Sequence, residues 1–98
     1  MSFDSVILRG FIEKVIETQL TNENLAILHN TFERIRPYVK DREDALIGYI
    51  IGWVNASIVS FFTQSLKRQP TEEETKELVE SMINNISRMK SRIHETFT

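Results

Sequence analysis

One stretch of the sequence decides the fold: residues 45–66 read ALIGYIIGWVNASIVSFFTQSL and carry no formal charge over 22 positions. Asp41 can cap a helix just before this stretch, because its side chain can accept a hydrogen bond from the first helical turn. The helix then runs from Arg42 to about Lys67, a length of 26 residues, or about 40 Å at ~1.5 Å per residue. An apolar helix of this length calls for apolar neighbours along most of its circumference.

Such a helix is long enough to span a bilayer, so a membrane segment is the first alternative. Asn55 lies at its centre, however, and the following polar residues are Ser57, Ser60, Thr63 and Gln64. The other predicted helices also carry apolar stripes that need a partner. Because a helix that is apolar on most sides is usually the centre of a bundle, we expect a soluble protein rather than a membrane span.

Small side chains recur at every fourth position of this helix: Gly48, Gly52, Ala56 and Ser60. A ridge of small residues lets another helix approach closely. The other helices of one chain of 98 residues can cover only part of this apolar helix. Soluble monomers rarely leave a large apolar patch exposed. We therefore expect a homodimer with this ridge, or the aromatic face that includes Trp53, at the interface. The alternative interface is the last predicted helix, which carries an approximate heptad seam of Val79, Met82, Ile86, Met89 and Ile93.

Three further helices are expected from the helical spacing of apolar residues. They are Phe3–Gln19 with Ser2 as its cap, a helix that begins near Asn22 with Thr21 as its cap and stops or kinks at Pro37, and Thr71–Phe97 with a Thr71–Glu74 capping box. Residues 36–41 are the expected connection after the second of these. The expected stripes are Phe3, Val6, Ile7, Phe11, Ile12, Val15 and Ile16 in the first helix, and Leu78, Val79, Met82, Ile83, Ile86, Met89, Ile93 and Phe97 in the last.

Only residues 68–70 separate the two longest helices, so they should fold back as an antiparallel hairpin. Few turns are available elsewhere, because the chain has 3 Gly and 2 Pro. The expected fold class is all-α: one domain over residues 1–98, built as a four-helix bundle with a long C-terminal antiparallel helical hairpin.

Composition excludes several classes of function. The chain has no Cys, which rules out disulfides, thiolate catalysis and Cys-ligated zinc. The net charge of -2 exerts no global attraction toward nucleic acid. The start of the chain, MSFDSVILRG, has no basic region before its apolar residues and does not resemble a signal peptide. We expect a cytoplasmic protein without a cofactor.

Two basic clusters make a small nucleic-acid-binding regulator the main alternative. Arg34, Arg36, Lys40 and Arg42 surround Pro37, and Arg88, Lys90 and Arg92 lie in the last helix. The residues of the first cluster are also typical of a solvent-exposed connection between two helices. The second follows an acidic helix start, an order that the helix dipole favours. Both clusters are therefore interpreted first as ordinary charged surface.

Arg88 and His94 have five residues between them, a spacing that resembles the Arg-to-His motif of the HEPN ribonucleases, which are helical and dimeric. The resemblance covers the last helix only, and Met89 stands where that family usually has a polar residue. It implies that His94 acts as general acid or base and that Arg88 stabilises phosphate charge. His29 and Glu33, spaced i,i+4, lack further ligands for a metal.

The favoured function is thus non-catalytic: an interaction or regulatory module whose apolar helix face binds a second copy or a helix of another protein. A nucleic-acid-binding regulator and, after it, a HEPN-like ribonuclease are the alternatives.

Overall fold

A computed structural model describes residues 4–97, and every element in that range is helical. Its elements in chain order are α1 (Ser5–Gln19), α2 (Asn22–Ile35), the 3-10 turn η1 (Arg36–Tyr38), α3 (Arg42–Phe61), the π-helical turn η2 (Phe62–Leu66), α4 (Glu72–Asn84) and α5 (Ile86–Phe97). The fold class is therefore all-α, with five α-helices in the described range where four were expected.

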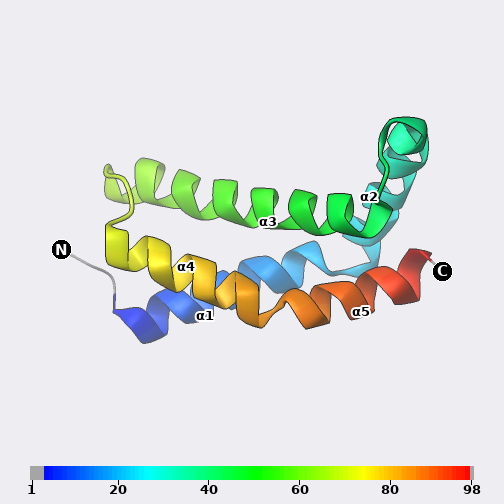
Figure 1. The fold of residues 1–98 in the computed structure, drawn as a ribbon. Coiled ribbons are helices and arrows are strands. Elements are labelled where there is room, and N and C mark those ends of the chain that lie inside the picture. Colours follow the sequence, from blue (N-terminus) through cyan, green and yellow to red (C-terminus); the bar gives the residue numbers. More distant parts are fainter. Residues whose placement is uncertain (1–3, 98) are drawn as a thin grey trace.

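Figure 1 shows an elongated molecule in which α3 runs along one side while α1, α4 and α5 run along the other. Its extents are 45 × 23 × 22 Å. α3 packs against α1 and α5, and α1 packs against α4. α2 stands off at the end where α3 begins (Figure 1). The core between these helices is made of Leu8, Ile12, Ile16, Leu20, Leu25, Leu28, Phe32, Leu46, Ile47, Ile50, Val54, Ile58, Phe62, Leu78, Met82, Met89 and Ile93.

The N-terminal helix begins later than expected and turns a different face inward. Asp4, not Ser2, is the N-cap, because its carboxylate accepts hydrogen bonds from the amides of Val6 and Ile7. Ser2 and Phe3 lie outside the described residues. The buried stripe is Leu8–Ile12–Ile16, whereas Val6 and Ile7 are 80% and 61% exposed. The expected stripe was wrong at its start because apolar residues with helical spacing occupy both faces there.

Local stop signals end the two middle helices. α2 ends at Ile35 and is followed by a 3-10 turn with Pro37 near its start, as expected of a residue that cannot donate to a helix interior. α3 passes into the π-helical turn and ends at Lys67, whose φ of 57° is left-handed. The amides of Lys67 and Arg68 both donate to the carbonyl of Phe62, which closes the wide turn before the chain reverses.

The expected last helix is broken into two at Asn85. Asn85 is 7% exposed. Its side-chain amide donates hydrogen bonds to Glu13 Oε1 at 2.8 Å and to the carbonyl of Ser81 at 2.7 Å. A short polar side chain that bonds the preceding turn competes with the regular helix pattern. Thr71 caps α4 with the full capping box to Glu74, which confirms that prediction.

Candidate interaction surface

The outer face of α3 is the side of the helix turned away from the core. We define it by six residues, all exposed: Gly48, Tyr49, Gly52, Trp53, Ala56 and Ser60. The opposite side of the helix is closed, since Ile50, Val54 and Ile58 are at most 1% exposed. The residues proposed from sequence as an interface therefore lie together on one open face.

The two glycines on this face meet nothing in their own chain. A Cβ atom built at Gly48 or at Gly52 would have no heavy atom within 4 Å. The close helix crossing expected at this ridge is thus not made within one copy. Gly10 on α1 also faces open space.

A row of aromatic rings runs along the outer face and connects it to α2. Phe32 of α2 packs edge-on against Tyr49 with ring centroids 5.9 Å apart, and Tyr49 stacks on Trp53 at 6.2 Å. Phe32 is buried, whereas Tyr49 is 41% and Trp53 50% exposed. Aromatic side chains half in solvent offer a large apolar contact area to a partner.

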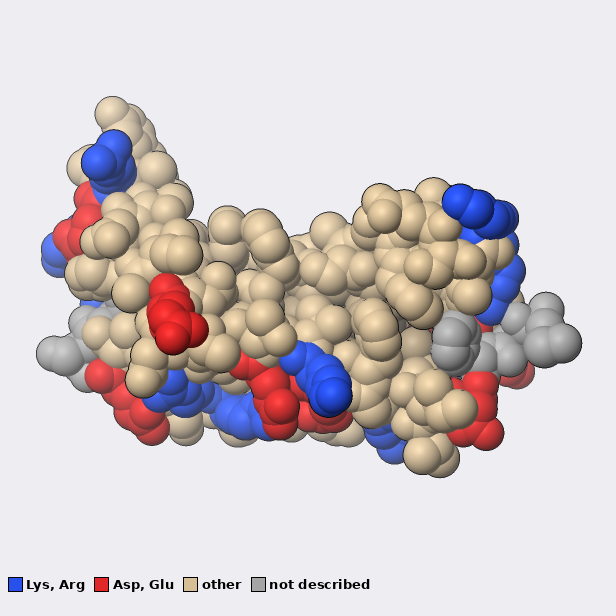
Figure 2. Space-filling model, turned by 180° about the vertical axis from the view of Figure 1, so that it is seen from behind, with Lys and Arg blue, Asp and Glu red and all other residues tan. Residues whose placement is uncertain are grey.

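Charge is distributed away from this face. Figure 2 shows an uncharged band across the upper part of the molecule, with charged side chains at its two ends and a mixture of basic and acidic side chains along the lower edge. The band agrees with the 22 uncharged positions of residues 45–66. A surface without charge loses little solvation energy when a partner covers it.

Two members of the first basic cluster lie near one carboxylate. Glu33 lies 3.6 Å from Arg36 and 3.7 Å from Arg42. Arg34 and Lys40 are exposed on α2 and on the turn after it. Two of the four candidate nucleic-acid contacts are therefore engaged with an acid of the same chain.

The second basic cluster serves the fold. Arg92 donates two hydrogen bonds to the carbonyl of Leu20, at 3.2 and 3.0 Å, and one to Asn22 Oδ1 at 2.7 Å. It therefore fixes the turn between α1 and α2 to α5. Arg88 lies 3.6 Å from Glu13 of α1. The arrangement gives Arg92 a structural role that its sequence context did not reveal.

The structure does not bring Arg88 and His94 into one site. Arg88 pairs with Glu13 on α1, and His94 Nε2 lies 3.1 Å from Glu43 on α3. Six positions on a helix rotate two side chains about 120° apart. His29 and Glu33 are 4.0 Å apart, and residues 4–97 contain no group of three or more His, Asp or Glu that could hold a metal.

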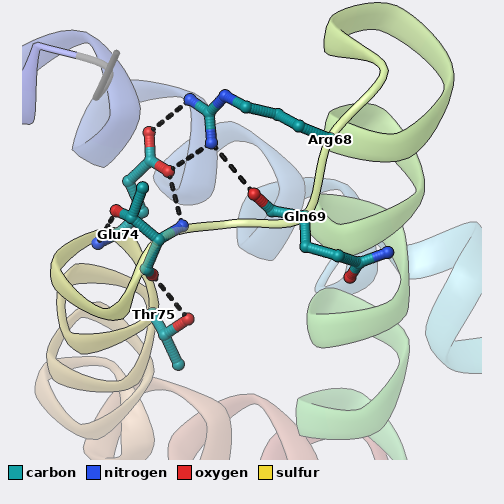
Figure 3. A network of polar contacts seen from close by, with 5 residues as sticks. Arg68, Gln69, Glu74 and Thr75 are labelled. Atoms are coloured by element: carbon teal, nitrogen blue, oxygen red, sulfur yellow. Dashed lines mark hydrogen bonds and ion pairs between the residues drawn. The ribbon is translucent and has the colours of Figure 1, made fainter.

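A partly buried ion pair at the α3–α4 reversal was not foreseen. Both nitrogens of the Arg68 guanidinium end bond the Glu74 carboxylate, at 2.8 and 3.0 Å, and Glu74 also accepts from the amide of Thr71 (Figure 3). The Glu74 side chain is 2% exposed. The hydrogen bond to Glu74 raises the pKa of Arg68 above its ordinary value. The capping box predicted a structural role for Glu74, but the contact with Arg68 could be seen only in the folded structure.

A second ion pair joins α1 to α4. Arg9 bonds Glu77 at 2.7 Å, and the Ser5 hydroxyl donates to the same carboxylate at 2.8 Å. The hydrogen bond from Arg9 and then that from Ser5 lower the pKa of Glu77. Like the contacts of Glu13 and Glu33, this ion pair forms within one copy of the chain and involves no residue of the outer face of α3.

By length and composition alone, Arg42–Leu66 could cross a membrane: its mean hydropathy reaches 1.7 over a window of which 33% is buried. A single helix of this kind is weak evidence, because core helices meet the same criteria. No protein-family model, curated protein or solved structure matches the chain significantly.

Proposed function

We propose that this protein is a non-catalytic interaction module in which two copies pair through the outer face of α3. The observation that carries the proposal is that Gly48 and Gly52 lie open on an uncharged, aromatic-bordered helix face. A second copy brings the same uncharged face, and a two-fold contact buries that face twice. Small domains also gain stability from association, because alone they bury little of their surface.

The test is the oligomeric state of a matched pair of glycine variants. Light scattering on a sizing column should report a dimer for the native chain at micromolar concentration. Gly52→Leu should weaken it by about 1–3 kcal/mol, or about fivefold to two-hundredfold in Kd, because a branched side chain overpacks a close contact. Since neither glycine meets a neighbour in its own chain, Gly10→Leu on α1 is the control and should leave the dimer unchanged.

Two results would contradict this proposal. One is a monomer at high concentration for the native chain. The other is a Gly52→Leu dimer as tight as that of Gly10→Leu, which would move the contact away from α3, with the α4–α5 surface around Val79 and Ile83, 43% and 59% exposed, as the next candidate.

We expect no ribonuclease activity, because Arg88 and His94 of α5 contact different acids, Arg88 the Glu13 carboxylate of α1 and His94 the Glu43 carboxylate of α3. Incubation of the purified protein with a labelled RNA should leave the RNA intact, and His94→Ala should change nothing. Cleavage that is lost in a folded His94→Ala variant would reverse this expectation and support the HEPN-like alternative.

A further inference from the structure

We propose that the two copies pair antiparallel, so that the beginning of one α3 lies beside the end of the other. This inference rests on the proposed function, since it concerns the same face. It adds the orientation and the register of the partner, which the exposure of the face alone does not give.

Charge at the two ends of the face carries the orientation. Asp44 comes directly before the uncharged residues 45–66, and Lys67 comes directly after them. Both side chains are exposed, and neither forms an ion pair within residues 4–97. A parallel pair would place Asp44 beside Asp44 of the partner subunit and Lys67 beside Lys67 of the partner subunit. An antiparallel pair places opposite charges together, which complementary interfaces require.

The small residues give the register. Gly48, Gly52, Ala56 and Ser60 are centred on position 54, so antiparallel pairing sets position 48 opposite 60 and position 52 opposite 56. Every small residue then faces another small residue. Asp44 lies about 15 Å and Lys67 about 20 Å from that centre along the axis. The long lysine side chain can span the difference when the helices cross at a shallow angle.

The shape of the molecule favours the same orientation. α2 stands off beside the beginning of α3, and no helix projects in the same way at the other end (Figure 1). Seen from behind, this projection rises at one end of the uncharged band (Figure 2). A parallel pair would bring two such projections to one end of the dimer. An antiparallel pair leaves each projection beside the end of the partner's α3.

Because the chain has no Cys, single introduced thiols can read the orientation. Gly48→Cys and Ser60→Cys are prepared separately, checked for native helicity by circular dichroism, and treated with a short bismaleimide crosslinker alone and as a mixture. Antiparallel pairing should give a covalent dimer mainly in the mixture, because only there do positions 48 and 60 meet. Gly10→Cys mixed with Ser60→Cys is the control and should stay uncrosslinked.

The outcomes separate the two proposals. Covalent dimers in each single variant but not preferentially in the mixture would overturn the antiparallel orientation and leave the α3 interface standing. A dimer by light scattering without any crosslink would overturn the orientation and the α3 face together. A monomer would remove the proposed function itself. If either cysteine variant loses helicity, the charge variants Asp44→Lys and Lys67→Glu give an independent measurement of the orientation.

Charge reversal gives a second measurement of the orientation. Asp44→Lys should weaken the antiparallel dimer by roughly tenfold at low salt, since two exposed charge pairs are replaced by repulsion. Adding Lys67→Glu to the same chain should recover most of that loss. If the double variant is weaker than the single variant, positions 44 and 67 do not face one another and the orientation is wrong.

Discussion

Phe62→Ala is expected to lower the free energy of unfolding by about 3–5 kcal/mol, the usual cost of truncating a buried Phe. Phe62 is 0% exposed and lies where α3 passes into the π-helical turn. Its ring packs edge-on against Phe61 at 5.9 Å and lies 5.0 Å from the Arg68 guanidinium carbon. A domain of 98 residues has about 5–15 kcal/mol in total, so the variant should be largely unfolded in mild denaturant.

Urea unfolding followed by circular dichroism measures this loss. Tyr38→Ala is the matched control, because it also removes one aromatic ring, and Tyr38 is 87% exposed; its effect should stay within about 0.5 kcal/mol. A loss below about 1 kcal/mol for Phe62→Ala would mean that the ring is not enclosed as described.

Glu74→Ala is expected to cost about 2–4 kcal/mol of unfolding free energy, because it removes a buried carboxylate from the ion pair with Arg68 and from the capping box. The carboxylate accepts hydrogen bonds from Arg68 and from the Thr71 amide, and its side chain is 2% exposed. The same urea titration measures the change.

Two neighbours divide this cost into its parts. Thr71→Ala removes the capping hydroxyl but keeps the ion pair, and should cost only about 0.5–2 kcal/mol. Glu72→Ala changes an exposed acid of the same first turn and should cost about 0.3–1 kcal/mol, the usual helix-dipole contribution. If Glu74→Ala costs no more than Thr71→Ala, the contact with Arg68 adds no stability.

The starts of α2, α3 and α4 and the end of α2 were predictable because their signals are local. Thr21, Asp41 and Thr71 cap α2, α3 and α4 in the structure, as their positions before apolar runs indicated. A capping side chain reaches amides only two or three residues ahead. Pro37 ended α2 for a similarly local reason, its missing amide proton.

The candidate interface was predictable in its membership, because a spacing of four keeps Gly48, Gly52, Ala56 and Ser60 near one side of a helix. That this side faces outward was not. The same ridge could have held α1 or α4 closely, and only the burial of Ile50, Val54 and Ile58 shows that the chain used the opposite side for its own core.

Long-range polar contacts could not be predicted either, because the sequence does not show which helices lie side by side. From the sequence, Arg92 was a candidate nucleic-acid contact. In the structure it bonds Leu20 and Asn22, which are 72 and 70 positions away along the chain. The helix break at Asn85 could not be predicted, because Asn85 bonds Glu13, which is also 72 positions away.

The sequence by itself determined the all-α class, the caps of α2, α3 and α4 and the uncharged run of residues 45–66, since each depends on neighbours within a turn or on composition. Tertiary structure alone decided which face of α1 is buried, where the last helix breaks and which charges are paired. Those features depend on which helices lie side by side, and a helical period is the same for a face that meets the core and for one that meets solvent.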